Sequence, residues 1–116
     1  MITTQIDLTT IGFTQHAKED RVDRLSNCIA TVGIGNIVFL CKSTRAKYPN
    51  EIVLNCVTSS GLVLIINATK NKIITGYLGT VRHVEGLYRG EGLRRLPDEL
   101  FRTLRKNEKK YWYLYE

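Results

Sequence analysis

The chain has 116 residues, of which 43% are hydrophobic and 24% are charged, and this composition indicates a single globular domain with a core of its own. No stretch approaches the roughly eighteen unbroken apolar residues of a membrane span, and the sequence opens without a basic segment followed by an apolar run. We therefore expect neither a membrane helix nor a secretory signal. The formal net charge of +6 makes a polyanion, nucleic acid above all, the first partner to consider.

The N-terminal part predicts one long helix. Residues 1–10 carry little periodicity and suit a short strand or an arm. The helix is expected to begin at Thr14, an N-cap residue preceded by the hydrophobic Phe13, and to run to residue 32. Its apolar stripe, which should face the core, consists of Val22, Leu25, Ile29 and Val32. Gly33 and Gly35 are placed to end the helix.

The middle of the chain predicts a meander of strands. The apolar run at residues 37–40 leaves a strand and a second helix both open, and a loop follows it. Three strands are predicted next, over residues 51–58, 62–67 and 72–78. Ser59, Ser60 and Gly61 form a hairpin loop in which the glycine supplies a positive φ. Strands joined by connections this short must be antiparallel.

The last third predicts a loop, a helix and a tail. Residues 82–95, with the sequence RHVEGLYRGEGLRR, are interrupted by glycines and indicate a loop. Pro97 suits the first position of a helix, and the acidic-then-basic order of charges after it suits the helix dipole. We expect the aromatic tail, YWYLYE, to pack on the core rather than to form a platform for bases. The predicted fold class is α+β, with the N-terminal helix on a three- to four-stranded antiparallel sheet and a C-terminal basic helix, in one domain over residues 1–116.

The cysteines indicate free thiols rather than disulfides. Cys28, Cys41 and Cys56 are odd in number, widely spaced and set in apolar surroundings, which suits buried thiols in a reducing cytoplasm. The sequence has no Cys-x-x-Cys pair and only two histidines, which argues against a structural zinc site. We expect no metal and no cofactor.

The basic residues are unevenly distributed, since nine of the 17 lysines and arginines follow Val81. A one-sided basic surface concentrates polyanions by Coulomb attraction and by counterion release. The alternative is that these charges only solvate a helix face. If nucleic acid is the partner, the residues expected to contact it are Lys18, Arg21, Arg82, Arg89, Arg94, Arg95, Arg102, Arg105, Lys106, Lys109 and Lys110.

Familiar catalytic motifs are absent, and the candidates for chemistry are dispersed along the chain. Metal-free cleavage of RNA needs a group that removes the 2′-hydroxyl proton, a group that protonates the leaving 5′-oxygen and a cation for the phosphoryl oxygens. Histidine suits the first two roles, and Arg or Lys, helped by a hydroxyl, suits the third. The candidate catalytic residues are His16, Arg24, Thr75, Tyr77 and His83.

Thr75 and Tyr77 close an otherwise apolar strand. Because side chains alternate along a strand, we expect them to share one face with Ile73, while Ile74 and Leu78 share the other. Two oxygens at the end of one face indicate either a site that handles phosphate or ordinary strand residues with a bonded hydroxyl.

The histidines have alternatives of the same kind. On an ideal helix His16 shares a face with Asp20, which predicts a solvated pair worth only tenths of a kcal/mol. His83 follows the end of a strand in a basic segment, where functional residues often lie, but it suits a simple surface position equally well.

Two short motifs resemble a known group of proteins. They are HAKEDRVDR, from His16 to Arg24, and ITGY, from Ile74 to Tyr77. Together with a helix and an antiparallel meander, they resemble the RelE/ParE-like toxins within the barnase–EndoU–colicin–RelE class of small metal-independent ribonucleases. The resemblance implies a toxin-type endoribonuclease that cleaves RNA to a 2′,3′-cyclic phosphate. It also implies that His16, Arg24, Thr75 and Tyr77 converge at one end of the sheet.

The expected partner is RNA or another single-stranded nucleic acid, with an antitoxin, an immunity protein or a host protein as a further partner. No membrane is expected as a partner. Two other functions stay open. One is a non-enzymatic basic module that binds nucleic acid, and the other is a small phage-type protein that binds and inhibits a host protein complex.

Overall fold

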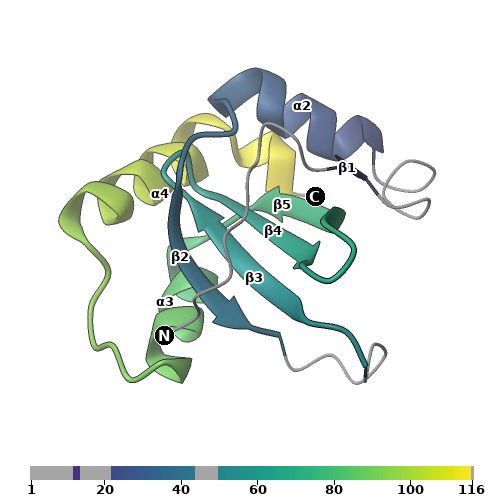
Figure 1. Ribbon diagram of the computed structural model, residues 1–116. Helices are drawn as coiled ribbons and strands as arrows, with labels where there is room; N and C mark the ends of the chain where they lie inside the picture. The colour runs from purple at the N-terminus through teal and green to yellow at the C-terminus, as the bar shows by residue number, and fades with distance from the viewer. Residues whose placement is uncertain (1–11, 14–21, 44–49, 116) are drawn as a thin grey trace.

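The computed structural model describes residues 12–13, 22–43 and 50–115. Its elements, in chain order, are β1 (Gly12–Phe13), α2 (Val22–Val32), β2 (Ile37–Lys42), β3 (Val53–Thr58), β4 (Leu62–Asn67), β5 (Lys72–Leu78), α3 (Val81–Gly90), α4 (Asp98–Lys110) and the 3₁₀ helix η1 (Trp112–Tyr115). The strands form one sheet in the order β1-β5-β4-β3-β2, and β2 to β5 are an antiparallel meander (Figure 1). The short β1 adds a parallel pair at the β5 edge. The predicted α+β class, with a helix on the sheet and a basic C-terminal helix, is confirmed.

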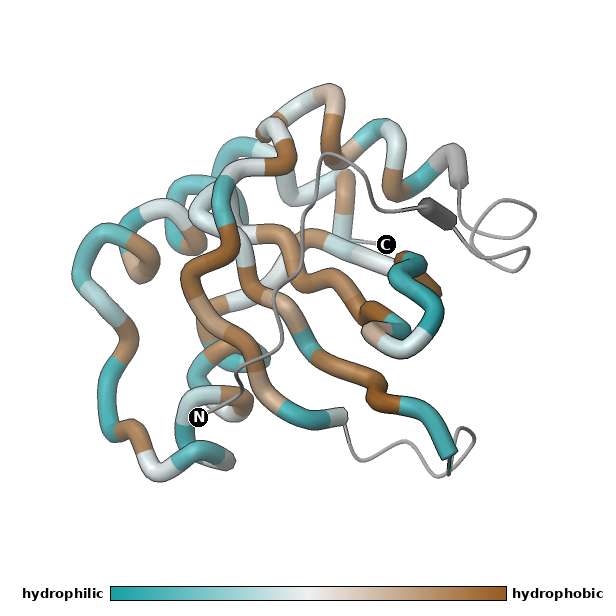
Figure 2. The backbone as a smooth tube through the Cα atoms, viewed as in Figure 1, coloured by the Kyte–Doolittle hydropathy of each residue, from teal (hydrophilic) through white to brown (hydrophobic). Residues whose placement is uncertain are grey.

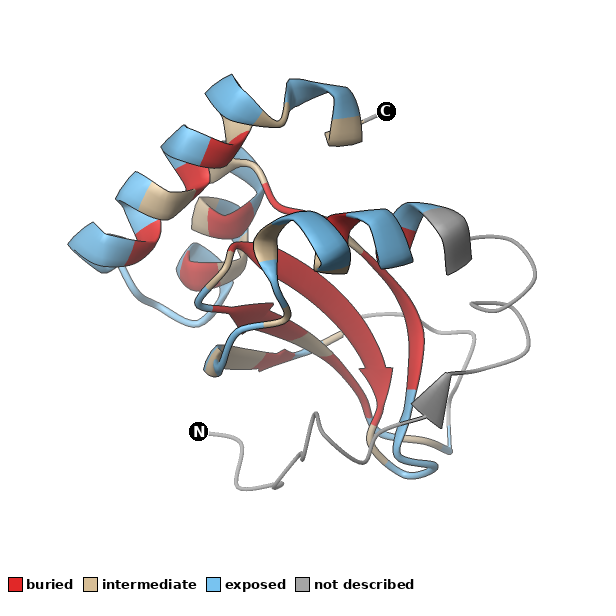
Figure 3. Cartoon of the chain, turned by 90° about the horizontal axis from the view of Figure 1, so that it is seen from above, coloured by how far each residue is buried: buried red, intermediate tan, exposed pale blue. Residues whose placement is uncertain are grey.

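Helices cover both faces of the sheet and divide the core into two layers. α2 lies on one face, and α3 and α4 lie on the other (Figures 1 and 3). We call the first layer the α2-side core; its residues are Leu25, Cys28, Cys56, Leu62, Leu64, Ile66, Ile73 and Leu78. The α3–α4-side core consists of Val53, Val57, Val63, Ile65, Ile74, Val84, Tyr88, Leu96, Leu100 and Leu104.

Strand β4 is buried along its whole length because it lies between these two layers. All six of its residues are buried, and Figure 2 shows the hydrophobic residues following the strands while α4 is mostly hydrophilic. The continuous apolar run of β4 is the pattern expected of a strand covered on both faces. The hairpin before it turns at Gly61 with a φ of 93°, as the sequence predicts.

A β-bulge in β5 changes the faces predicted for its residues. Ile73 pairs with Ile66 and Thr75 pairs with Ile65, so Ile74 is an extra residue in the strand. Ile73 therefore joins the α2-side core, whereas Ile74 joins the opposite core. The prediction that Ile73 shares a face with Thr75 and Tyr77, and Ile74 with Leu78, is wrong. Regular alternation along the strand could not foresee the bulge.

The segment predicted as a loop at residues 82–95 is mostly helical. α3 occupies residues 81–90, and only the part after it is a turn, with Gly92 at a φ of 78°. Thr80 caps this helix, and its hydroxyl accepts a hydrogen bond from the backbone N–H of His83 at 3.1 Å. Val84 and Tyr88, four residues apart, bury one side of α3 against the sheet. Glycine discouraged the helix prediction, but tertiary packing of this apolar side outweighs its low helix propensity.

Other boundaries agree closely with the sequence predictions. The predicted start of the first helix at Thr14 lies outside the described residues; from Val22 the helix is described, and it ends before Gly33, which has a φ of 80°. The open segment 37–40 belongs to the edge strand β2. Pro97 is the N-cap of α4 rather than its first helical residue, and its carbonyl accepts from the N–H of Phe101 at 2.9 Å.

The three cysteines, Cys28, Cys41 and Cys56, are buried free thiols, as the sequence predicts. Burial raises the pKa of the Cys56 thiol to about 12. Such thiols are inert at neutral pH because the reactive thiolate is not formed. Within the described part of the chain, no helix is long and apolar enough to cross a membrane.

Candidate nucleic-acid interface

The nine basic residues after Val81 are all exposed, and they lie on one side of the molecule. α3 and α4 cover the same face of the sheet, so their outer surfaces are neighbours (Figure 3). Five acidic residues occur over the same 81–110 segment, which leaves an excess of positive charge there. The exposed basic residues are Arg82, Arg89, Arg94, Arg95, Arg102, Arg105, Lys106, Lys109 and Lys110.

On α4 the helical period gathers three of these cations into a line, which we call the basic stripe: Arg102, Arg105 and Lys109. They lie three and four residues apart, and Leu100 and Leu104 are buried on the other side of the helix. The described residues provide no ion pair for any of the three. The ion pairs at this surface, Arg89–Glu85 at 3.7 Å and Arg95–Asp98 at 3.8 Å, involve exposed side chains and stabilise little.

Exposed aromatic side chains follow the basic stripe. Trp112 is 65% exposed and Tyr113 is 52% exposed, and their rings meet edge to face with centroids 6.0 Å apart. The prediction that the tail packs down holds only for Tyr111, Leu114 and Tyr115, which contact the α2-side core. A 3₁₀ turn has three residues, so positions 111 and 114 face inward together while the two between them point outward.

The tail is fixed in place at its end. The Tyr115 hydroxyl donates to the carbonyl of Gly79 at 3.0 Å, and burial together with the charge of Glu108 raises the pKa of Tyr115 to about 12. Trp112 and Tyr113 are thus presented by an anchored segment.

Tyr77 and His83, two of the predicted catalytic residues, are in direct contact. The Tyr77 hydroxyl and Nε2 of His83 are 2.6 Å apart, and the rings lie 5.4 Å apart at 55°. The pair exists because β5 ends at Leu78 and Thr80 starts α3 at once, which brings the first helical turn back over the strand end. His83 is an exposed residue, but partial desolvation of its ring lowers its pKa, so the neutral form is favoured near neutral pH. A neutral imidazole can accept a proton.

Of the other predicted catalytic residues, Thr75 shares a sheet face with Tyr77, and Arg24 lies on the opposite side of the sheet. Thr75 is buried and faces the α3–α4 side, as its pairing with Ile65 requires. Arg24 is exposed on α2, which covers the opposite face, so the predicted convergence of Arg24 with Thr75 and Tyr77 is not found. His16, Lys18 and Arg21 lie outside the described residues.

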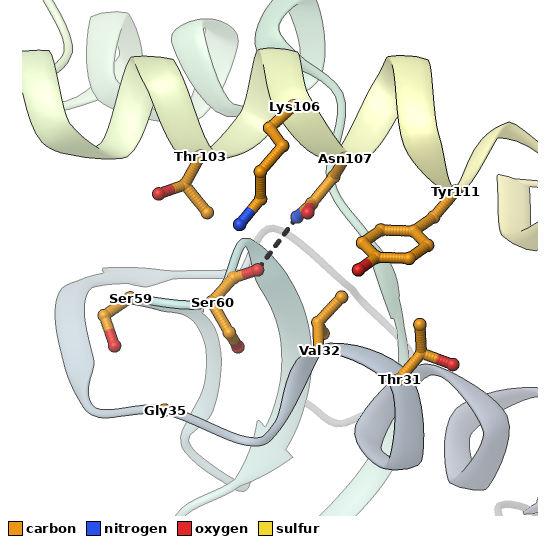
Figure 4. Close-up of a pocket in the computed structure, with 9 residues that line it drawn as sticks. All are labelled: Thr31, Val32, Gly35, Ser59, Ser60, Thr103, Lys106, Asn107 and Tyr111. Carbon is orange, nitrogen blue, oxygen red and sulfur yellow. Dashed lines mark hydrogen bonds between the residues drawn. The ribbon is translucent and has the colours of Figure 1, made fainter.

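A polar cleft of about 370 Å³ lies between α2, the β3–β4 turn and α4 (Figure 4). Its lining residues are Thr31, Val32, Gly35, Ser59, Ser60, Thr103, Lys106, Asn107 and Tyr111. Sequence reasoning missed this cleft. Its one visible signal is Asn107, a polar residue at a position that continues the buried series Leu100 and Leu104 on α4.

Neither a metal-binding cluster nor a match to a known protein indicates the function. Among the described residues no three His, Cys, Asp or Glu side chains come together in a way that could hold a metal ion. No model of a known protein family matches the chain, and no curated protein or solved structure matches it either. The resemblance to the RelE/ParE-like toxins therefore stays a prediction, and function is argued from the residues.

Proposed function

We propose that the protein binds RNA or another single-stranded nucleic acid along the outer surface of α4 and the aromatic segment that follows it. One observation carries the proposal: the exposed cations of the basic stripe, which have no ion-pair partner among the described residues, are followed along the chain by the exposed rings of Trp112 and Tyr113. Cations hold the phosphate backbone, and unpaired bases stack on exposed aromatic rings. A duplex hides the faces of its bases, so this combination favours a single strand.

The basic stripe is tested by a charge-matched pair of triple variants. Arg102→Gln with Arg105→Gln and Lys109→Gln removes three charges from the stripe. The control, Arg24→Gln with Lys42→Gln and Lys72→Gln, removes three exposed charges elsewhere. For the first variant the dependence of log K on log salt should fall by about two units, since each lost contact with a single strand removes roughly 0.7. Fluorescence anisotropy with a labelled oligoribonucleotide, repeated at several salt concentrations, measures this dependence. Equal losses in both variants would mean general attraction and no specific surface.

The aromatic segment is tested with the protein's own fluorescence. Trp112 is the single tryptophan of the chain, so its emission reports one position. Stacking of a base should quench it, and Trp112→Ala should cost about 1–3 kcal/mol of binding free energy. Phe101→Ala is the matched control, because Phe101 is also exposed on this side but lies near the other end of α4. An unchanged emission on saturation with RNA contradicts stacking.

A second function, metal-independent cleavage of RNA, is favoured by the Tyr77–His83 contact. A neutral His83 is suited to take the 2′-hydroxyl proton through Nε2, whose present partner is the Tyr77 hydroxyl that the substrate would displace. Arg82, the neighbouring residue in the first turn of α3, is an exposed cation for the phosphoryl oxygens. As the 2′-oxygen attacks, the bond from phosphorus to the 5′-oxygen breaks, the 5′-oxygen takes a proton from water, and the products are a 2′,3′-cyclic phosphate and a 5′-hydroxyl.

Cleavage is tested by substituting each of the two histidines alone and assaying in EDTA. His83→Gln should slow cleavage by about 10²–10⁴-fold, the usual contribution of an acid–base group. Loss only with His16→Gln would instead favour the arrangement that the toxin resemblance implies. Products ending in a 3′-hydroxyl, or abolition by chelation, would rule out this mechanism. A protein partner, whether an antitoxin or a host complex, remains a prediction from the sequence.

A further inference from the structure

The cleft beside α4 has one charged group, and that group lies next to the basic stripe. Lys106 follows Arg105 on α4 and extends along the cleft, opposite the β3–β4 turn (Figure 4). The described residues provide no ion pair for its ammonium group. Because Lys106 is adjacent to Arg105 on α4, a nucleic-acid strand bound along the basic stripe lies beside a cation that belongs to the cleft.

The hydroxyl groups of the cleft divide into those whose protons are used and those whose protons are free. Thr31 donates to the carbonyl of Asn27 at 2.7 Å, Thr103 to that of Glu99 at 3.0 Å, and Ser60 to that of Gly33 at 2.7 Å. These three oxygens retain lone pairs and act as acceptors. The Ser59 hydroxyl accepts from the backbone N–H of Asn36 at 2.9 Å, and the Tyr111 hydroxyl makes no hydrogen bond with the described residues, so both can donate into the cleft alongside Lys106.

The walls of the cleft are fixed before any ligand binds. Asn107 is buried and donates through Nδ2 to the carbonyl of Ser60 at 2.9 Å, which ties α4 to the β3–β4 turn. Ser60 ties the same turn to the loop after α2 through Gly33. A pocket that is already ordered loses little conformational entropy on binding.

We propose that this cleft binds the phosphorylated terminal nucleotide of a single-stranded RNA, an inference that rests on the proposed nucleic-acid binding. The phosphate lies on Lys106 and Tyr111, which are donors, and the ribose hydroxyls donate to the acceptor oxygens of Ser60 and Thr103. A volume of about 370 Å³ is within the usual range for a small-ligand pocket. A terminal phosphate monoester carries more charge than an internal diester and has three free oxygens, which suits a cleft with one cation.

The test compares one oligoribonucleotide in three forms: with a 5′-phosphate, with a 3′-phosphate and with hydroxyls at both ends. One phosphorylated form should bind about tenfold more tightly than the hydroxyl form, the effect of a charge-assisted hydrogen bond. Lys106→Gln should abolish this preference, and Tyr111→Phe should reduce it. Lys109→Gln, the matched loss of charge outside the cleft, should weaken all three forms and leave their ratios unchanged.

Each result bears on a different claim. Equal affinity for the three forms, with salt dependence intact, overturns the cleft assignment and leaves the basic stripe standing. A preference that survives Lys106→Gln also overturns it, as does a preference lost equally in Lys109→Gln. No binding of any form overturns both the assignment and the proposed function. Circular dichroism confirms that the variants are folded, which the exposure of both lysines favours.

Discussion

The two faces of the sheet are covered by helices that differ in how they pack and in what they expose. On one face α2 approaches so closely that a β-carbon at Gly76 would lie 2.9 Å from Cδ1 of Leu25. On the other face α3 and α4 bury apolar sides and expose basic ones, with Gly86 facing open space. The first face contributes mainly stability, although the aromatic tail packs beside its core, and the second combines stability with the basic stripe proposed to bind RNA. Substitutions on each face separately test this division.

The largest expected effect comes from truncating a core leucine on each face. Leu25→Ala and Leu104→Ala should each reduce the free energy of unfolding by about 3 kcal/mol, because each removes a fully buried side chain and leaves a cavity. Only Leu104→Ala should also weaken RNA binding by the folded protein, since it loosens the helix that carries the basic stripe. Urea unfolding and anisotropy measure the two quantities. Weaker RNA binding by folded Leu25→Ala would contradict the division between the faces.

Substituting one glycine on each face should give opposite signs. Gly76→Ala should cost about 1–3 kcal/mol, because the new methyl would lie 2.7 Å from Cδ2 of Leu64 and 2.9 Å from Cδ1 of Leu25. Gly86→Ala lies in the middle of α3 with no atom within 4 Å, so it should raise stability by about 0.5–1 kcal/mol. The melting temperatures of the two variants show the sign of each change in stability. Loss of stability in Gly86→Ala would show that the outer side of α3 is not open.

A smaller effect on stability is expected at Thr75, where a substitution tests whether the hydroxyl takes part in chemistry beside the Tyr77–His83 pair. Thr75→Val keeps the shape and the strand propensity, so stability should change by no more than about 1 kcal/mol. If the hydroxyl contacts phosphate in a cleavage reaction, turnover should fall by roughly a hundredfold. Both are measured on one preparation. A stable variant with unchanged cleavage would make Thr75 only a strand residue.

The smallest effect concerns pH. Burial lowers the pKa of His83 in the folded protein, so between the unfolded value of about 6.5 and the folded value the unfolded chain binds more protons. Stability should therefore fall as the pH falls below about 6.5 and level off below the folded pKa. His83→Gln should show a weaker dependence, while His16 is common to both proteins and cancels. Parallel pH dependences from urea unfolding would place the His83 ring in ordinary solvent.

The elements β5 and α3 show which structural features can be predicted from the local sequence pattern and which cannot. The strand pattern over residues 72–78 was sufficient to find β5, because β-branched residues between turn signals have few alternatives. It could not reveal the extra residue Ile74, since a bulge depends on the pairing with β4. For α3, Gly86 and Gly90 concealed a helix that Val84 and Tyr88 stabilise through contacts with the sheet.

The candidate site likewise has parts that could be predicted from the sequence and parts that depend on the tertiary structure. The sequence alone determined the excess of basic residues after Val81 and the free cysteines, because charge and composition do not depend on the fold. It also determined most strand boundaries, which follow from local periodicity. Only the tertiary structure decided that Tyr77 meets His83, that Arg24 is on the other face and that Trp112 is exposed. Contacts between distant segments are fixed by which apolar faces bury one another, and that choice is made by the whole core at once.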